Sequence, residues 1–399
     1  MNPWPVARAA LRRGWRAALA MALLVALTTA VGTGIGMIER SVRVAAARAA
    51  DPFDLVIGAP GSAAQLVLTS VYLQPDTVPL LDGAVLVKIM ADPDVAWASP
   101  VAFGDSYRGM PILGVAPILV TQGGTRTVTE GKVFGAEGEA VVGAAVALRL
   151  GDTIVPQHGL IEAGEAHHHS ESPTKVVGRL PPTGTAWDRA ILVAVESVWE
   201  IHGLGNGHPE GIERVGPPWE LPAGVPAVVV KPKTLAGAYQ LRARYRSATS
   251  TAVFPGEVLA SLFRTLGDAR ALVSAIVYLT AALVIGAVFL AFGAIVAGRA
   301  RNHAVLRAIG ASPGFVLGAL WLELGAVLAA GVVGGLALGW LGAQIAAGPI
   351  GRAGGLTLSP SLARPELVLA LAVLAGGLIA AALPALLAAR TPIGVGLKR

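Results

Sequence analysis

Residues 271–297 read ALVSAIVYLTAALVIGAVFLAFGAIVA and contain no charged side chain. This run of 27 residues exceeds the ~20 that an α-helix needs to cross the hydrocarbon core of a bilayer. Residues 299–314 then read RARNHAVLRAIGASPG, and Gly310 with the Pro313-Gly314 pair indicates the end of a short basic helix. The stretch therefore predicts a membrane-spanning helix that leads into a compact helix at one face of the bilayer, where we expect an outside partner to act.

The charges are distributed as in a membrane protein. The chain is 54% hydrophobic and 14% charged. Residues 39–270 carry 19 Lys or Arg and 23 Asp or Glu, whereas the rest of the chain carries 12 basic and 2 acidic residues. This is the positive-inside pattern, and it argues against nucleic-acid binding. Ten of those twelve basic residues form three clusters without acidic neighbours: Arg8, Arg12, Arg13 and Arg16; Arg299, Arg301 and Arg307; Arg390, Lys398 and Arg399.

Four apolar spans give a consistent topology with all three basic clusters inside. The predicted fold is an α-helical membrane protein with four transmembrane helices and an α+β extracytoplasmic domain inserted between helices 1 and 2. The glycines of the third span allow close helix packing. We expect a cytoplasmic N-terminus (1–16), helix 1 (17–38), the extracytoplasmic domain (39–270), helix 2 (271–297), a cytoplasmic coupling helix (298–314), helix 3 (315–350), an external loop (351–366), helix 4 (367–387) and a cytoplasmic C-terminus (388–399).

The first span has a competing interpretation as a cleaved signal peptide. Small residues near position 47 would suit cleavage, but Glu39, Arg40 and Arg43 intervene. The apolar region is also longer than the 7–15 residues of a signal-peptide core. An uncleaved anchor is therefore favoured.

The segment 39–270 shows the alternation of short elements that is typical of an α+β domain. Glycine- and proline-containing turns separate β-rich runs. Trp187, Trp199 and Trp219 are expected to be core or interface residues and not to form a ligand-binding site. The predicted strands are 111–120, 175–180, 189–195 and 226–230, and the predicted helices are 138–150, 234–247 and 255–266.

Several of these stretches resemble the MacB/FtsX/LolCE-type ABC transporter permeases. Residues 54–68 (DLVIGAPGSAAQLVL) are similar to the family's segment just beyond its first helix, and residues 138–152 are similar to its element of a helix followed by Gly-Asp. Residues 175–185 and 188–193 look like its paired external strands. Residues 301–312 match its cytoplasmic pattern, although Asn302-His303 replace acidic residues that are frequent there.

The resemblance implies a permease subunit that works with two copies of a cytoplasmic ABC ATPase and a second permease copy. ATP and Mg²⁺ would be bound by the ATPase, and this chain is not expected to be an enzyme, since it has no Gly-x-x-x-x-Gly-Lys-Ser/Thr loop. The resemblance also implies that the chain lies in the bacterial inner membrane. There it would contact membrane lipid and a periplasmic or outer-membrane partner. The predicted ATPase-docking residues are Arg301, His303, Val305, Leu306, Arg307 and Ile309.

A histidine-rich run lies between residues 158 and 171. Its candidate metal ligands are His158, His167, His168 and His169, interleaved with glutamates. Imidazole and carboxylate groups together suit Zn²⁺, Cu²⁺ or Ni²⁺. The alternative is a solvated loop, because glycine, serine and proline surround the run. We expect at most weak Zn²⁺ binding.

Glu323 is the one acidic residue inside an apolar span. A charge at the middle of a bilayer costs about 2.5–3.5 kcal/mol, which often marks function. The third span is too long for a single crossing, so position 323 is expected near the cytoplasmic headgroups. An orienting contact with Arg301 or Arg307 is favoured over a proton relay.

These observations predict a MacB-type permease that relays the ATP-driven motion of a separate ATPase to its extracytoplasmic domain. The substrate class would be a peptide, lipoprotein, drug or metal-linked compound. The first alternative is a transmembrane regulator that signals to a cell-envelope partner without transport. The second alternative is a membrane-anchored metal-binding sensor built on the histidine-rich run.

Overall fold

A computed structural model describes residues 2–158, 167–168, 173–265 and 267–390. The chain divides into two compact units, which we describe separately. The helical unit comprises Met1–Ser41, Leu266–Pro349 and Leu358–Arg399, and the α+β unit comprises Val42–Thr265 and Ile350–Thr357.

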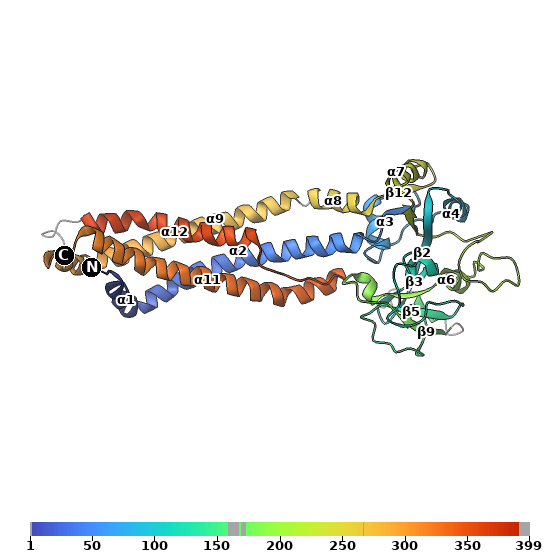
Figure 1. Cartoon of the computed structure of the whole chain (residues 1–399), viewed down its shortest axis with the longest axis horizontal. Helices are drawn as coiled ribbons and strands as arrows, with labels where there is room; N and C mark the ends of the chain where they lie inside the picture. The colour runs from blue at the N-terminus through green and yellow to red at the C-terminus, as the bar shows by residue number, and fades with distance from the viewer. Residues whose placement is uncertain (1, 159–166, 169–172, 266, 391–399) are drawn as a thin grey trace. The chain divides into compact units, whose positions relative to one another are not determined.

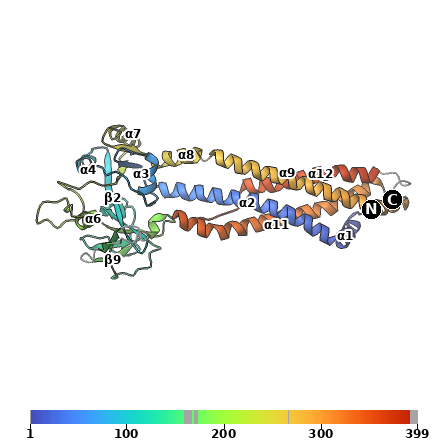
Figure 2. The same ribbon diagram turned by 180° about the vertical axis from the view of Figure 1, so that it is seen from behind.

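Among the described residues of the helical unit, four helices are long and apolar enough to cross a membrane, which confirms the predicted number. In Figures 1 and 2 these helices run side by side. Each extends beyond its predicted span by at least one residue at both ends. The helices of this part of the chain are α1 (Trp4–Arg13), α2 (Trp15–Ala50), α9 (Gly267–Gly298), α10 (Ala300–Ala308), α11 (Pro313–Gly354) and α12 (Arg364–Arg390).

Glycines at every fourth position bring α11 close to α2. A Cβ placed on Gly335 would lie 2.5 Å from the Cβ of Thr29, and one placed on Gly331 would lie 2.8 Å from the carbonyl oxygen of Ala22. At Gly339 the nearest atom would be the Thr33 hydroxyl, at 2.4 Å. Without side chains the two backbones can approach, so contact between small residues stabilises this helix pair.

The side chains of the bundle separate into a buried core and an outward apolar surface. Val25, Phe292 and Leu328 are buried in a shared cluster. Leu23 and Leu279 are among the apolar side chains that stay exposed, at 56% and 63%. Exposed apolar surface of this kind is expected where helices face lipid or another membrane-embedded chain.

The described strands of the α+β unit form one mixed sheet. The main path runs in the order β12-β1-β11-β2-β3-β10-β5-β9-β4, with β6 paired to β9 and β7 paired to β2 and β8. The strands are β1 (Leu55–Gly58), β2 (Val95–Tyr107), β3 (Met110–Val115), β4 (Glu130–Gly131), β5 (Glu139–Val142), β6 (Thr153–Ile154), β7 (Gln157–His158), β8 (His167–His168), β9 (Thr174–Arg179), β10 (Ile191–Ala194), β11 (Ala227–Pro232) and β12 (Thr251–Val253).

Both faces of this sheet are buried. Leu55 and Ile57 of β1 belong to one apolar cluster, whereas Val56 between them belongs to another. Because neighbouring side chains of a strand point to opposite faces, both faces must be covered. The covering elements are α3 (Ala63–Ser70), α4 (Gly83–Met90), α5 (Pro117–Val120), η2 (Ala186–Arg189), α6 (Val195–Ile201), α7 (Leu235–Arg244) and α8 (Pro255–Thr265).

Most predicted elements of this unit are confirmed. The predicted helices at 234–247 and 255–266 correspond to α7 and α8, and the hydroxyl of Thr234 caps α7 by accepting the Gly237 N–H at 3.0 Å. The strands predicted at 175–180, 189–195 and 226–230 correspond to β9, β10 and β11. The strand predicted at 111–120 is confirmed only as far as Val115, the end of β3, and is wrong for Pro117–Val120, which form the short helix α5. The three tryptophans expected to be core or interface residues are buried.

The helix predicted at 138–150 is wrong. Residues Glu139–Val142 form β5, which pairs with β10 on one side and β9 on the other. A Cβ on Gly143 would lie 2.3 Å from the carbonyl oxygen of Trp187, so the backbone leaves the strand where only glycine fits. Burial of Ala140, Val141 and Val142 on the two sheet faces thus stabilises a strand here, although the local sequence pattern is that of a helix.

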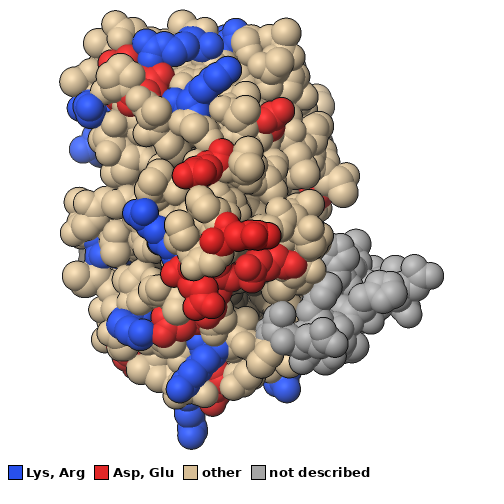
Figure 3. Space-filling model, turned by 90° about the vertical axis from the view of Figure 1, so that its right-hand side faces the viewer, with Lys and Arg blue, Asp and Glu red and all other residues tan. Residues whose placement is uncertain are grey.

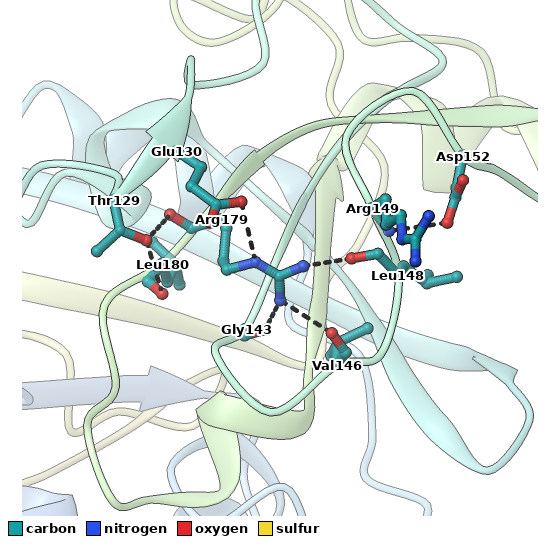
Figure 4. Close-up of polar contacts among 9 residues, drawn as sticks. All are labelled: Thr129, Glu130, Gly143, Val146, Leu148, Arg149, Asp152, Arg179 and Leu180. Carbon is teal, nitrogen blue, oxygen red and sulfur yellow. Dashed lines mark hydrogen bonds and ion pairs between the residues drawn. The ribbon is translucent and has the colours of Figure 1, made fainter.

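Arg179 holds the irregular chain that follows β5 (Figure 4). Its guanidinium group donates to the carbonyl oxygens of Gly143 at 3.4 Å, Val146 at 2.9 Å and Leu148, and it pairs with Glu130 at 3.4 Å. One arginine on β9 therefore replaces the backbone hydrogen bonds that a helix would have supplied.

Candidate functional site

The short helix α10 joins the second and third apolar helices. Arg299 is its N-cap residue, Ile309 its C-cap residue, and Gly310 follows with a φ of +101°. The next helix starts at once, because the Ser312 hydroxyl accepts the N–H of Phe315 at 3.2 Å and Pro313 occupies the first helical position. The sequence thus confines α10 between two fixed helix ends.

One side of α10 is exposed. Arg301, Val305 and Ile309 follow one another at intervals of four residues, so they form a stripe along the helix. Val305 is 46% exposed and Ile309 is 76% exposed. We call these three residues the outer stripe. It presents two apolar side chains and a cation that has no ion-pair partner among the residues described.

The opposite side of α10 is turned into the helical unit. His303 and Leu306 line a cavity of about 210 Å³ together with α1 and α11. His303 and Arg307 line a second cavity of about 520 Å³, which α9 and α12 also line. The six predicted docking residues therefore divide into the exposed Arg301, Val305 and Ile309 and the inward His303, Leu306 and Arg307. Helical spacing in the sequence predicts that Val305, Leu306 and Ile309 share one face of the helix, and this prediction is wrong for Leu306.

Glu323 pairs with Arg299, not with Arg301 or Arg307 as predicted. The guanidinium Nη1 lies 2.7 Å from the carboxylate Oε1, and the Glu323 side chain is 11% exposed. Arg299 precedes the first turn of α10, on the side that carries His303, and so it reaches α11. The pair fixes the start of α10 against α11.

His303 is a half-buried polar residue of this region. Burial lowers the pKa of its imidazole, and the positive charge of Arg299 lowers that pKa further. Within the described part of the chain, its Nδ1 atom has no hydrogen-bond partner. A neutral imidazole is consistent with its place beside two arginines.

A second ion pair joins α2 to the start of α12. Arg40 Nη1 lies 2.5 Å from Glu366 Oε1, and Arg40 also donates to the carbonyl oxygen of Ser361. The other carboxylate oxygen of Glu366 accepts the N–H of Ala363 at 2.9 Å, which caps α12. Ser41 accepts the N–H of Ser359 at 2.8 Å. The connection into α12 is therefore held by α2.

The histidine-rich run lies largely outside the described residues. His169 and the interleaved glutamates are not described, whereas the backbone pairs His158 of β7 directly opposite His167 of β8. Among the residues that are described, no group of three or more metal-ligating side chains occurs. Weak Zn²⁺ binding by His158, His167, His168 and His169 stays a prediction.

Sequence reasoning missed a buried carboxylate in the α+β unit. Glu196 of α6 is fully buried, and its Oε1 accepts the N–H of Gly216 at 2.7 Å and the indole N–H of Trp219 at 2.6 Å. The Nε2 atom of His208 lies 3.7 Å from the same oxygen. Its signal in the sequence is an acidic residue inside the apolar run 191–199. Glu196 anchors the long connection between α6 and β11.

Further acidic groups lie near this anchor, and Figure 3 shows acidic side chains gathered on one face of the α+β unit. Burial raises the pKa of Glu137 to about 7, with further increases from a hydrogen bond with Glu200 and from the negative charges of Glu200 and Glu196. Ionisation of Glu137 thus destabilises the folded protein.

This raised pKa predicts a pH dependence of stability. Because Glu137 titrates near 4.5 when unfolded and near 7 when folded, the folded state binds the proton more tightly between these values. The free energy of unfolding should therefore fall as pH rises from about 4.5 to about 7. Denaturant unfolding of the full chain in detergent should show this slope, and Glu137→Gln should reduce it. Identical slopes for the two proteins would contradict the assignment.

The bundle and its short connecting helix define a multi-pass membrane protein. Residues 274–393 match the family model described as FtsX-like permease C-terminal. This match covers most of α9 and all of α10, α11 and α12. The chain therefore carries an FtsX-like permease domain, and the resemblance predicted from its sequence is confirmed for this part of the chain.

Two solved structures were found by comparison of folds. The periplasmic region of MacB from Actinobacillus actinomycetemcomitans is 9% identical, with 53% of this chain and 94% of that chain covered and a TM-score of 0.32. The extracellular domain of the noncanonic ABC-type transporter YknZ from Gram-positive bacteria is 10% identical, with 50% and 98% covered and a TM-score of 0.30. These scores are too low to carry an argument about this chain. A comparison with curated proteins found no match.

Proposed function

We propose that this chain is the permease subunit of a MacB-type ABC system. It relays ATP-driven motion of a separate cytoplasmic ATPase to its own α+β domain, which acts on a periplasmic substrate. The observation that carries the proposal is the match of residues 274–393 to the FtsX-like permease model, because α10 with its outer stripe lies inside that match.

The exposed surface of α10 fits a protein contact. The outer stripe offers two exposed apolar side chains and one cation in a short, firmly positioned helix. Interfaces concentrate their binding energy in a few such anchors. In this proposal the ATPase contacts Arg301, Val305 and Ile309, while Arg299 and Glu323 transmit the displacement of α10 to α11.

The arrangement in the membrane follows from the distribution of charge. The basic clusters assign both chain ends and α10 to the cytoplasm and residues 39–270 to the other side. ATP hydrolysis is assigned to the partner, and two ATPase copies with two permease copies would complete the assembly in the inner membrane. A cell-envelope partner would receive the output if the chain acts as a regulator.

The outer stripe provides the experiment. Val305→Asp and Ile309→Asp each place a carboxylate in the proposed contact, where desolvation of a charge is unfavourable. We expect each variant to bind the ABC ATPase that copurifies with the wild-type chain at least roughly thirtyfold more weakly, the effect of losing about 2 kcal/mol at an anchor residue. Binding would be measured by titration of the detergent-solubilised permease.

Leu362→Asp is the matched control. Leu362 is 46% exposed, as Val305 is, and lies between α11 and α12, away from α10 in the sequence. It should leave ATPase binding unchanged. Undiminished binding by both stripe variants would refute α10 as the docking helix, and absence of any binding by the wild-type chain would refute the ATPase partnership.

A further inference from the structure

The first helix of the chain has two chemically different sides. Ala7 of α1 is 1% exposed and packs inward, whereas Trp4, Arg8 and Arg12 follow one another at intervals of four residues on the exposed side. Arg13 joins them, and these four residues line a groove of about 630 Å³. We call this side the basic face of α1.

The basic face has no acidic partner in the described part of the chain. No Asp or Glu occurs in residues 1–38, and the ion pairs of the described residues do not include Arg8, Arg12 or Arg13. The nearby guanidinium group of Arg16 lies 5.6 Å from the ring centroid of Trp15. Positive charge is therefore concentrated here without compensation from the residues that the structure describes.

The position of α1 gives it access to lipid headgroups. Helix α2 begins at Trp15, and its residues 17–38 form the uncharged span. The end of the basic face at Arg12 and Arg13 therefore lies about one helical turn from the place where the chain enters the bilayer. Trp4 and Trp15 are 45% and 56% exposed, and tryptophan favours the boundary between headgroups and acyl chains. Arginine on the polar side and tryptophan beside it are typical of helices that lie in the membrane interface.

The inward side of α1 faces the proposed docking helix. Val6, Ala7 and Ala10 line the cavity of about 210 Å³ together with His303 and Leu306 of α10. The contact of α1 with the membrane surface is thus linked to the position of α10. The meaning of this link for ATP hydrolysis rests on the proposed function, whereas lipid binding itself does not.

We propose that the basic face of α1 is a binding site for anionic phospholipid. Arg8, Arg12 and Arg13 bind the lipid phosphate through charge-assisted hydrogen bonds, and Trp4 contacts the region below the headgroup. Zwitterionic lipid presents a phosphate but no net charge, so it binds more weakly.

Quenching of tryptophan fluorescence by brominated lipid tests the site. The full chain would be placed in nanodiscs that contain graded fractions of brominated phosphatidylglycerol or brominated phosphatidylcholine. The variant Trp4→Phe/Trp15→Phe identifies the part of the signal that comes from these two residues. We expect half-maximal quenching of that part at a severalfold lower fraction of phosphatidylglycerol than of phosphatidylcholine. The triple variant Arg8→Gln/Arg12→Gln/Arg13→Gln should lose this preference, because each arginine contributes roughly fivefold to binding.

Two controls separate the site from net charge and from folding. Lys88→Gln/Lys233→Gln/Arg246→Gln removes the same charge from exposed positions of the α+β unit and should keep the preference. Replacing the three arginines of α1 with lysine keeps the charge and should also keep it. Equal quenching by both lipids in the wild type, or a preference that survives in the glutamine variant, would overturn the proposal. Loss of the preference in inorganic phosphate, but not in chloride of equal ionic strength, would identify a soluble anion as the ligand and would overturn it too.

Discussion

Replacing Gly335 with alanine should destabilise the helical unit by about 2–3 kcal/mol, the upper part of the range of about 1–3 kcal/mol that overpacking a close-packed contact costs. The added methyl group would lie 2.5 Å from the Cβ of Thr29 and 2.6 Å from the carbonyl oxygen of Ala26. The second of these atoms belongs to the backbone of α2, so rotation of a side chain cannot relieve the clash. The two helices must therefore separate. Unfolding of the full chain in mixed detergent micelles would measure the loss.

Gly342→Ala is the control on the same helix. Apart from the adjoining residues and backbone of α11 itself, no heavy atom of the described residues lies within 4 Å of a Cβ built at Gly342. Alanine is the better helix former by about 1 kcal/mol, so this variant should be unchanged or slightly more stable. The two substitutions are chemically identical, and only the neighbours differ. Equal effects at both positions would show that α11 does not pack against α2 through Gly335.

The structure could be predicted from the sequence where a long pattern is compatible with only one conformation. A single uncharged run such as 271–297 can cross a membrane only as a helix, because each backbone N–H and C=O must find its hydrogen-bond partner within the segment. The four apolar helices were predicted for this reason. The glycines of α11 were likewise predicted to allow close packing, although the pairing of Gly335 with Thr29 needs the three-dimensional structure.

Prediction failed where distant segments decide the local structure. Residues 139–142 become a strand because β9 and β10 occupy both of their edges, and these strands lie more than thirty residues further along the chain. Glu196 is anchored by Gly216 and Trp219, which no local pattern connects to it. Periodicity within a short window contains no information about such partners.

The docking helix shows the same limit at the level of single side chains. Helical spacing places Val305, Leu306 and Ile309 within one broad arc, so the sequence treats them as one face. The neighbouring helices divide that arc, because α1 and α11 form a cavity that Leu306 lines, while Val305 and Ile309 stay exposed. The packing of α1 and α11, two separate segments, thus decides which apolar residues of α10 remain exposed to a partner.

Removing either partner of the Arg299–Glu323 pair should destabilise the helical unit by about 3 kcal/mol. Breaking a buried ion pair costs about 3–5 kcal/mol because one charge is left without compensation, and the lower value applies here since the Arg299 side chain is 24% exposed. The two residues are 24 positions apart and connect the start of α10 to α11 at 2.7 Å. We therefore expect Arg299→Met and Glu323→Met each to lower stability and to loosen α10.

The double variant Arg299→Met/Glu323→Met makes this prediction specific. With both charges gone, no unpaired charge remains, and two apolar side chains of similar length can pack in the same place. The double variant should lose less stability than the two single variants lose together. We expect a coupling of about 2 kcal/mol or more in the double-mutant cycle. Unfolding of all four proteins in the same micelles measures that coupling. Strict additivity would mean that the two side chains act independently, and other contacts of α10 would then have to hold it against α11.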